Sequence, residues 1–229
     1  MKFKLLVVLT ALTMFFAVPM LQADVYYSHP YDWNSTNAFS SYYYDANSGG
    51  HQSFADYWWD GSFTMTDFHW WGTPWYENAD IDGFVFQIYD QAAGAPLPGN
   101  LLYEQYVAGA AGATPTGDDV VGNPVYSYWL DLTTPFTLAG PQYLWFSVYA
   151  ISDGDLVNWF WAMGDGDPFQ EDWVYEGMSN WKHLSEIDPA ADDGFAFEIT
   201  GGCEVPEPGT LALFGIGLVG MAVRRFRRK

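Results

Sequence analysis

The chain has 229 residues, of which 49% are hydrophobic and 20% are aromatic, and its formal net charge is −20. All but one of its eight basic residues lie in the first four or the last six positions, so Lys182 is the only cation in residues 24–204. That stretch holds all of the 28 acidic residues except Glu207, so one positive charge faces 27 negative ones, a formal charge of −26. Such a surface repels nucleic acid, anionic lipid and phosphorylated ligands, which leaves cations and neutral polymers such as polysaccharides as partners. Acidity that serves only solubility is the alternative interpretation.

The first 23 residues have the three parts of a secretory signal peptide. Met1–Lys4 is basic, Leu5–Val18 is apolar, and Leu21-Gln22-Ala23 fits the small-residue pattern of a cleavage site. Cleavage after that triplet would begin the mature chain at Asp24. We therefore expect export, with residues 24–204 forming one exported domain of ordinary size.

The body of the chain shows period-two alternation and few helix signals. In the segment Asp82–Tyr89, for example, three large apolar side chains fall on one face of a strand. Other predicted strands are Ser62–Trp71, Leu101–Val107, Val125–Leu132, Tyr143–Ala150 and Asp193–Ile199. Glycine and proline turns separate these segments, as at Ala139–Gln142. About eight to ten short strands of this kind predict an all-β fold, an antiparallel β-sandwich or jelly roll.

Several segments of the body also share a pattern with known proteins. They are Trp71-Gly72, Phe84–Asp90, Pro98–Leu102, Leu130–Leu132, Pro135–Leu138 and Tyr143–Val148. Together, over roughly residues 60–200, they resemble a β-sandwich type that recurs in exported bacterial surface proteins. The resemblance implies a fold and carries no established activity.

All twelve tryptophans lie in the body, several of them in dense clusters. The candidates for a carbohydrate-binding platform are Trp70, Trp71, Trp75, Trp159 and Trp161. An exposed indole can stack on the apolar face of a sugar ring, with carboxylates available for the hydroxyls. If their segment is a strand, Trp159 and Trp161 share a face, which is equally natural as a platform and as a stripe in the core. For the aromatic clusters as a whole the core is the preferred interpretation, because aromatic side chains dominate the buried surfaces of β-sandwiches.

An acidic segment at Gly164–Asp172 is the best candidate metal site. Its candidate ligands are Asp165, Asp167, Glu171 and Asp172. Calcium takes several hard oxygen ligands from a flexible loop, which alternating aspartates followed by a glutamate supply. The segment departs from an EF-hand because Gln170 replaces the required glycine. A solvated acidic loop without metal is the alternative, and no other cofactor is expected.

Catalytic motifs are missing from the sequence. It contains no Gly-x-Ser-x-Gly, His-Glu-x-x-His or phosphate-binding Walker segment. The histidines are scattered without metal-ligand spacing, at His29, His51, His69 and His183. The lone cysteine, Cys203, has no local general base and is either incidental or a thiol for an intermolecular partner. We therefore expect a protein that is not an enzyme, although paired carboxylates among so many acids leave a glycoside hydrolase open.

The C-terminus has three parts in series. The motif is Val205-Pro206-Glu207-Pro208, the uncharged and mostly apolar run is Gly209–Val223, and the basic tail is residues 224–229 with Arg224, Arg225, Arg227, Arg228 and Lys229. Two prolines stiffen the motif, and the basic cluster is a stop-transfer signal that stays cytoplasmic. The arrangement resembles the PEP-CTERM sorting signal of Gram-negative bacteria, which exosortases, membrane protease-transpeptidases, recognise. The run is short for a membrane span, so a processed, transient insertion in the inner membrane is favoured over a permanent tail anchor.

These features together predict a secreted β-sandwich protein that an exosortase delivers to the cell surface or extracellular matrix. The sorting resemblance implies a setting rich in exopolysaccharide, as in a biofilm. A structural or adhesive role is the leading interpretation. A carbohydrate-binding module is the second, and an exported glycoside hydrolase the third.

Overall fold

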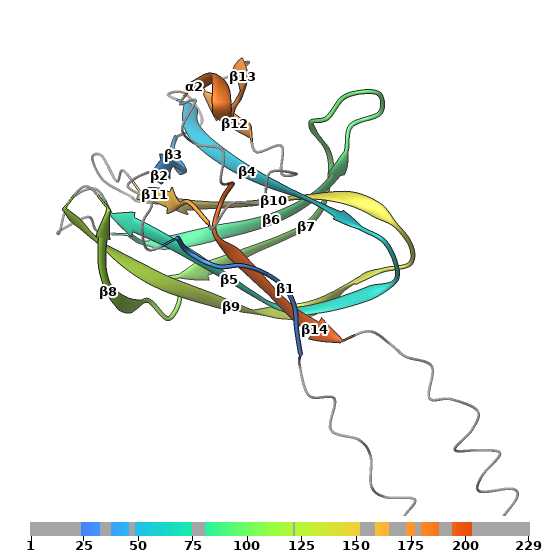
Figure 1. Ribbon diagram of the computed structural model, residues 1–229, viewed down its shortest axis with the longest axis horizontal. Coiled ribbons are helices and arrows are strands. Elements are labelled where there is room, and N and C mark those ends of the chain that lie inside the picture. The colour runs from blue at the N-terminus through green and yellow to red at the C-terminus, as the bar shows by residue number, and fades with distance from the viewer. Residues whose placement is uncertain are drawn as a thin grey trace, which may run out of the picture.

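The computed structural model describes residues 24–32, 38–45, 49–74, 81–120, 122–151, 159–164, 173–176, 180–187 and 194–202. These residues form two facing β-sheets and one helical turn (Figure 1). The predicted all-β class and antiparallel sandwich are confirmed. Among the described residues no helix is long and apolar enough to cross a membrane. The predicted signal peptide and the segment 205–229 lie outside the described residues.

Each sheet has seven strands. The first sheet contains β1 (Asp24–His29), β2 (Ala38–Ser40), β5 (Phe63–Pro74), β8 (Thr114–Val120), β9 (Asn123–Leu138), β11 (Trp159–Ala162) and β14 (Phe197–Gly202). The second sheet contains β3 (Tyr42–Asp45), β4 (Gly49–Trp59), β6 (Gly83–Gln91), β7 (Pro98–Ala108), β10 (Gln142–Ile151), β12 (Trp173–Glu176) and β13 (Asn180–His183). A single turn of helix, α2 (Leu184–Ile187), follows β13.

Strand β5 is the centre of the first sheet. It pairs with β9 along one side, where Phe68 lies opposite Leu130. On its other side β5 pairs with β14, where Phe68 lies opposite Ile199, and its last residues pair with β11. Strand β1 completes that side by pairing with β14, so the first and last strands of the body are neighbours.

Strand β10 is the centre of the second sheet. It pairs antiparallel with β4 and with β6, and β7 follows β6 at the edge. The short strand β3 lies beside the end of β10 in a parallel pair, with Tyr42 opposite Ala150. The chain passes between the sheets at the short connections 60–62 and 139–141, which join β4 to β5 and β9 to β10.

The core lies between the sheets and is rich in aromatic rings. Along β6 the side chains Phe84, Phe86 and Ile88 all face it and are at most 1% exposed, as the alternation predicted. Phe68 of β5 packs against Phe146 of β10 with ring centroids 5.6 Å apart. Large rings fill the space between two sheets because each buries far more area than an aliphatic side chain.

The predicted strands were found where the sequence placed them, but the structure contains further strands that were not predicted. Strands β5, β6, β7, β9, β10 and β14 coincide with predicted segments, but β9 runs unbroken for 16 residues and β7 begins at Pro98, before the predicted start at Leu101. Strands β1 to β4 were not predicted individually. In β4 the neighbours Phe54 and Ala55 are both buried, so burial on two faces removes the alternation that identifies a strand.

Candidate functional site

The outward face of the first sheet carries a set of polar side chains around one exposed tryptophan. We call it the outer polar face and define it by Ser28, Asp67, His69, Trp129, Asp131, Glu198 and Thr200. Two rows cross the strands. In the first row Glu198 of β14 lies opposite Ser28 of β1 and opposite His69 of β5, which in turn lies opposite Trp129 of β9. In the second row Thr200, Asp67 and Asp131 are cross-strand partners in the same way.

Strand alternation produces this face. The residues between the polar positions of β5 and β9, such as Phe68, Trp70 and Leu130, point into the core. Successive side chains of a strand point to opposite sides, so the intervening residues must face outward. Between Met65 and Asp67, β5 has one residue more than its partner β14, and this bulge sets the phase because one extra residue shifts every later side chain to the other face.

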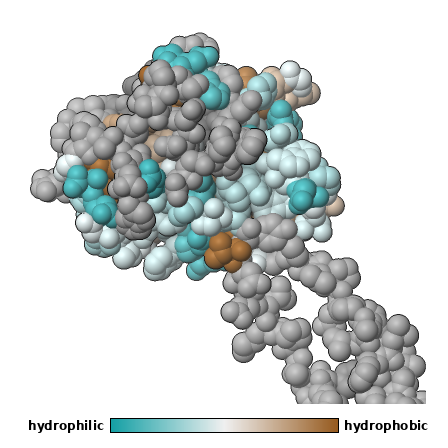
Figure 2. Space-filling view, in the orientation of Figure 1, coloured by the Kyte–Doolittle hydropathy of each residue, from teal (hydrophilic) through white to brown (hydrophobic). Residues whose placement is uncertain are grey.

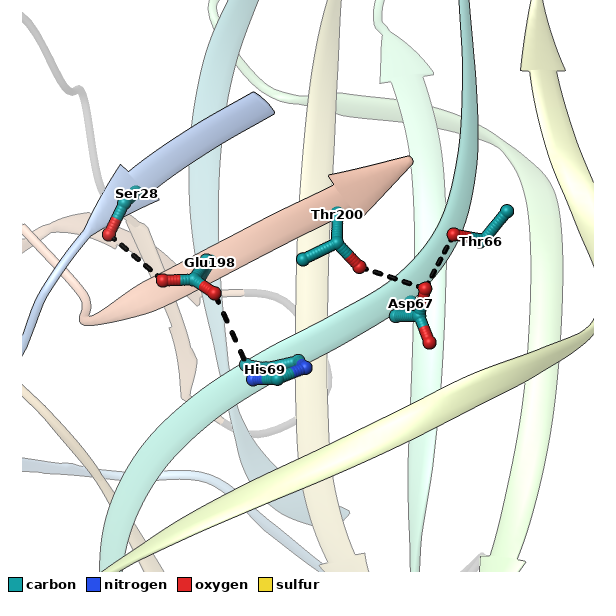
Figure 3. Close-up of polar contacts among 6 residues, drawn as sticks. All are labelled: Ser28, Thr66, Asp67, His69, Glu198 and Thr200. Carbon is teal, nitrogen blue, oxygen red and sulfur yellow. Dashed lines mark hydrogen bonds and ion pairs between the residues drawn. The ribbon is translucent and has the colours of Figure 1, made fainter. Parts of the chain in front are cut away.

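Polar contacts join neighbouring strands within each row (Figure 3). Ser28 Oγ donates to Glu198 Oε2 at 3.2 Å, and Glu198 Oε1 lies 4.0 Å from His69 Nδ1. Thr200 Oγ1 donates to Asp67 Oδ2 at 2.8 Å, and the hydroxyl of Thr66 donates to the same oxygen. The carboxylates of Asp67 and Glu198 are therefore held in fixed orientations on the sheet surface.

Asp67 and Asp131 are neighbouring carboxyl groups whose pKa values shift in opposite directions. Burial alone would raise the pKa of Asp67, but hydrogen bonds from Thr66, Asp131 and Thr200 outweigh it and lower that pKa below its usual value. The pKa of Asp131 is raised, chiefly because its protonated carboxyl hydrogen-bonds to Asp67. Asp67 thus keeps its charge while Asp131 is the member that takes up the proton.

Trp129 projects from this face at the end of the first row. It is 49% exposed, and its backbone N–H donates to the carbonyl of Ala111 at 3.1 Å. A Cβ on Gly112 would lie only 2.9 Å from the indole, so the ring rests directly on glycine backbone. Gly112 also has a φ of 66°, a left-handed conformation that glycine adopts readily. The turn after β7 therefore supports one side of the ring and leaves the rest accessible.

The chemistry available on this face is hydrogen bonding to fixed carboxylates beside an aromatic surface. Asp67 and Asp131 are cross-strand partners, and Asp131 is open to solvent. Both carboxylates can therefore accept hydrogen bonds from a ligand that lies on this face.

Comparison with known proteins adds information about the C-terminus alone. Residues 204–228 match the family model of the PEP-CTERM protein-sorting motif. By this signal the chain is a PEP-CTERM protein. It is therefore an exported substrate of an exosortase, a membrane enzyme, and its C-terminus anchors it in the membrane before processing. A comparison with curated proteins finds no match.

Three tryptophans predicted as a carbohydrate platform of this PEP-CTERM protein lie in its core instead. Trp70, Trp159 and Trp161 are each 0% exposed, so none can reach a ligand. Trp70 stacks on Tyr128 at 5.5 Å, and Trp161 Nε1 donates to the carbonyl of Ala196 at 2.8 Å. The platform prediction is wrong for these residues, and the preferred core interpretation is confirmed.

Of the remaining predicted site residues, one is described by the structure and the others lie outside the described residues. Trp71 is partly buried against a small apolar cluster on the outer side of the first sheet, whereas Trp75 lies outside the described residues. The calcium candidates Asp165, Asp167, Glu171 and Asp172 also lie outside them, as does the motif Val205-Pro206-Glu207-Pro208 with its basic tail. Within the described ranges no three His, Cys, Asp or Glu side chains form a group that could hold a metal.

Sequence reasoning missed the outer polar face. The alternation in Val125–Leu132 places Trp129 and Asp131 opposite to the core side chains, so their outward direction was readable. The cross-strand neighbours were not, because the pairing of β9 with β5 depends on contacts some 60 residues apart in sequence, as between Asp67 and Asp131. Register of that kind is set by the whole hydrophobic pattern of both strands.

Proposed function

We propose that this PEP-CTERM protein is a non-enzymatic structural or adhesive component of the cell surface or extracellular matrix, where it contacts exopolysaccharide as in a biofilm. The observation that carries the proposal is the exposed Trp129 beside the fixed carboxylates of the outer polar face. The destination is inferred from the sorting signal, which implies an exported protein released from its membrane anchor by an exosortase.

The chemistry of the face favours a neutral glycan. The indole of Trp129 offers a flat apolar surface on which a sugar ring can stack, and the carboxylates of Asp67 and Glu198 accept hydrogen bonds from hydroxyl groups. An acidic polysaccharide would meet repulsion from a body that carries a formal charge of −26, one basic residue against 27 acidic ones.

A carbohydrate-binding module is the second candidate, favoured by the same exposed tryptophan. The two candidates differ in the consequence of binding. A structural protein is retained in the matrix and contributes to its cohesion, whereas a binding module needs only to recognise a ligand. Calcium at the Asp165–Asp172 segment remains a separate proposal that either function could accommodate.

The experiment measures binding of the processed protein, purified from the matrix fraction, to insoluble neutral and acidic polysaccharides. Trp129→Ala is compared with the wild type and with Trp58→Ala, a matched control because both tryptophans are 49% exposed on opposite sheets. We expect Trp129→Ala to weaken binding to a neutral glycan about tenfold, which corresponds to ~1.4 kcal/mol. The control should bind like the wild type.

Two results would contradict the proposal. Equal binding by Trp129→Ala and wild type would remove the outer polar face from the function. Release of reducing sugars from the polysaccharide by the wild type would replace a structural role by hydrolysis. Loss of matrix cohesion in a strain that produces only Trp129→Ala would favour the structural role over a simple binding module.

A further inference from the structure

Both ends of the exported body meet at one end of the sandwich (Figure 1). Asp24, the first residue of β1, pairs with Gly201 in β14, and Gly202 pairs with Thr64 near the start of β5. The connection from β4 to β5 and the turn from β9 to β10 lie at this same end, because Phe63 pairs with Leu138. We call it the tail end, since the sorting signal begins directly beyond it.

The tail end is close to the membrane before processing. Only six residues, 203–208, separate Gly202 from the apolar run that anchors the chain. Six residues span at most ~20 Å even when fully extended. The tail end must therefore face the bilayer, and the side chains exposed there are the first that a membrane surface meets.

Exposed aromatic and aliphatic side chains gather at this end. Trp58 of β4 and Tyr143 of β10 are cross-strand partners, 49% and 40% exposed, and their ring centroids are 4.7 Å apart. Val25 is 56% exposed beside the start of β1, and Figure 2 shows a compact hydrophobic patch low on the molecule. Leu101 and Leu102, 47% and 41% exposed, lie at the corresponding end of β7.

Charged residues are fewer in the described connections at the tail end than at the opposite end of the sandwich. Among the described connections at the tail end, 60–62, 92–97 and 139–141, Asp60 is the only charged residue. Asp82, Asp118 and Asp119 all lie at the other end, where β6 begins and β8 turns into β9. Asp24 and Asp90 lie in the strands at the tail end, but its described connections carry a single charge and therefore repel anionic lipid less than the opposite end does.

We propose that the tail end rests on the membrane before cleavage, with the Trp58–Tyr143 pair inserted at the lipid headgroup level. Tryptophan and tyrosine prefer this interface because an apolar ring and a polar N–H or O–H can each find a suitable environment there. The contact orients the body against the bilayer and holds the Pro-Glu-Pro motif at a fixed height. The pair is therefore a positioning device for the sorting reaction, independent of any glycan binding.

The test uses the full chain with its tail intact, reconstituted in protein-free vesicles of phosphatidylethanolamine and phosphatidylglycerol. A fluorophore is attached at Tyr143→Cys in a Cys203→Ser background, and lipids carrying a headgroup-level quencher are added. The control label is at Ile187→Cys in α2, an exposed hydrophobic position across the molecule from the tail end (Figure 1). We expect several-fold stronger quenching at position 143 than at position 187.

A second measurement monitors processing in cells that contain the exosortase. Trp58→Ser should slow the appearance of the cleaved form several-fold, and Trp129→Ser, with equal exposure on the other sheet, should leave the rate unchanged. Equal quenching at positions 143 and 187 would overturn the proposal. Slow cleavage of Trp58→Ser without quenching at position 143 would also overturn it, since the pair would then contact the enzyme and not the lipid.

Discussion

Two buried tryptophans allow the same substitution to be compared in two hydrogen-bonding environments. Trp70 and Trp161 are both 0% exposed in the core between the sheets. Trp161 Nε1 donates to the carbonyl of Ala196 at 2.8 Å, whereas Trp70 Nε1 is buried without a partner in the described part of the chain. Replacing each by phenylalanine removes the same atoms and leaves a similar cavity, so the cavity contribution cancels in the comparison.

The expected difference comes from the N–H group alone. Trp161→Phe removes a buried hydrogen bond with a net contribution of about 1 kcal/mol, whereas Trp70→Phe removes an unsatisfied donor whose burial costs about 1–3 kcal/mol. The free energy of unfolding of Trp161→Phe should therefore be lower than that of Trp70→Phe by ~2–4 kcal/mol. Urea unfolding with linear extrapolation measures both values, and unchanged m-values confirm comparable denatured states. A Trp70→Phe variant as unstable as Trp161→Phe would refute the reasoning.

Three further predictions concern the outer polar face, a close approach in the core and the acidic loop. Asp131→Asn should raise stability at neutral pH by ~0.2–1 kcal/mol, because it removes like-charge repulsion with Asp67 across the strands. The raised pKa of Asp131 contributes stability that the wild type loses as pH rises through it, so the advantage of the variant should vanish in acid; a pH series of melting temperatures tests this. Gly72→Ala should destabilise by about 1–3 kcal/mol, because a Cβ there would enter a buried indole of β11, whereas Gly61→Ala meets nothing within 4 Å and should behave like the wild type in the same urea assay. If the predicted calcium loop at residues 165–172 binds the ion, millimolar calcium should raise the melting temperature, and asparagine at its first two aspartates should abolish the increment; an unchanged melting temperature in the wild type would refute the site.

The sequence was sufficient to predict the strands whose two faces differ. In the sequence of β6 the large residues Phe84, Phe86 and Ile88 occupy alternate positions, and they line the core, although the opposite face of the strand is buried as well. The fold class followed from repeating that pattern with turns between. In strands β1 to β4 the alternation of large apolar and polar residues is too weak for the same inference. In β4, for example, adjacent residues on both faces are buried.

The site could not be predicted because it depends on which residues face each other across strands. Trp159 and Trp161 were correctly placed on one face of a strand, but the pattern is identical for a core stripe and a ligand platform. The distinction depends on whether another sheet covers that face. The neighbours of Trp129 on the outer polar face likewise depend on the register of β9 against β5, which a bulge near Asp67 shifts. Alternation along one strand contains none of this information.

The pairing of β1 with β14 determines when the body can fold during export. Strand β14 lies between β1 and the central strand β5, so the first strand to leave the membrane has no partner until the last one emerges. The sequence separation of that contact is close to the maximum for the domain, which makes its formation slow. The sorting signal comes directly after β14, so the chain is still held at the membrane when its closing strand emerges. The last step of folding therefore takes place close to the bilayer. Because β14 and the processing motif are synthesised one after the other, the domain is completely folded only when the motif has also emerged.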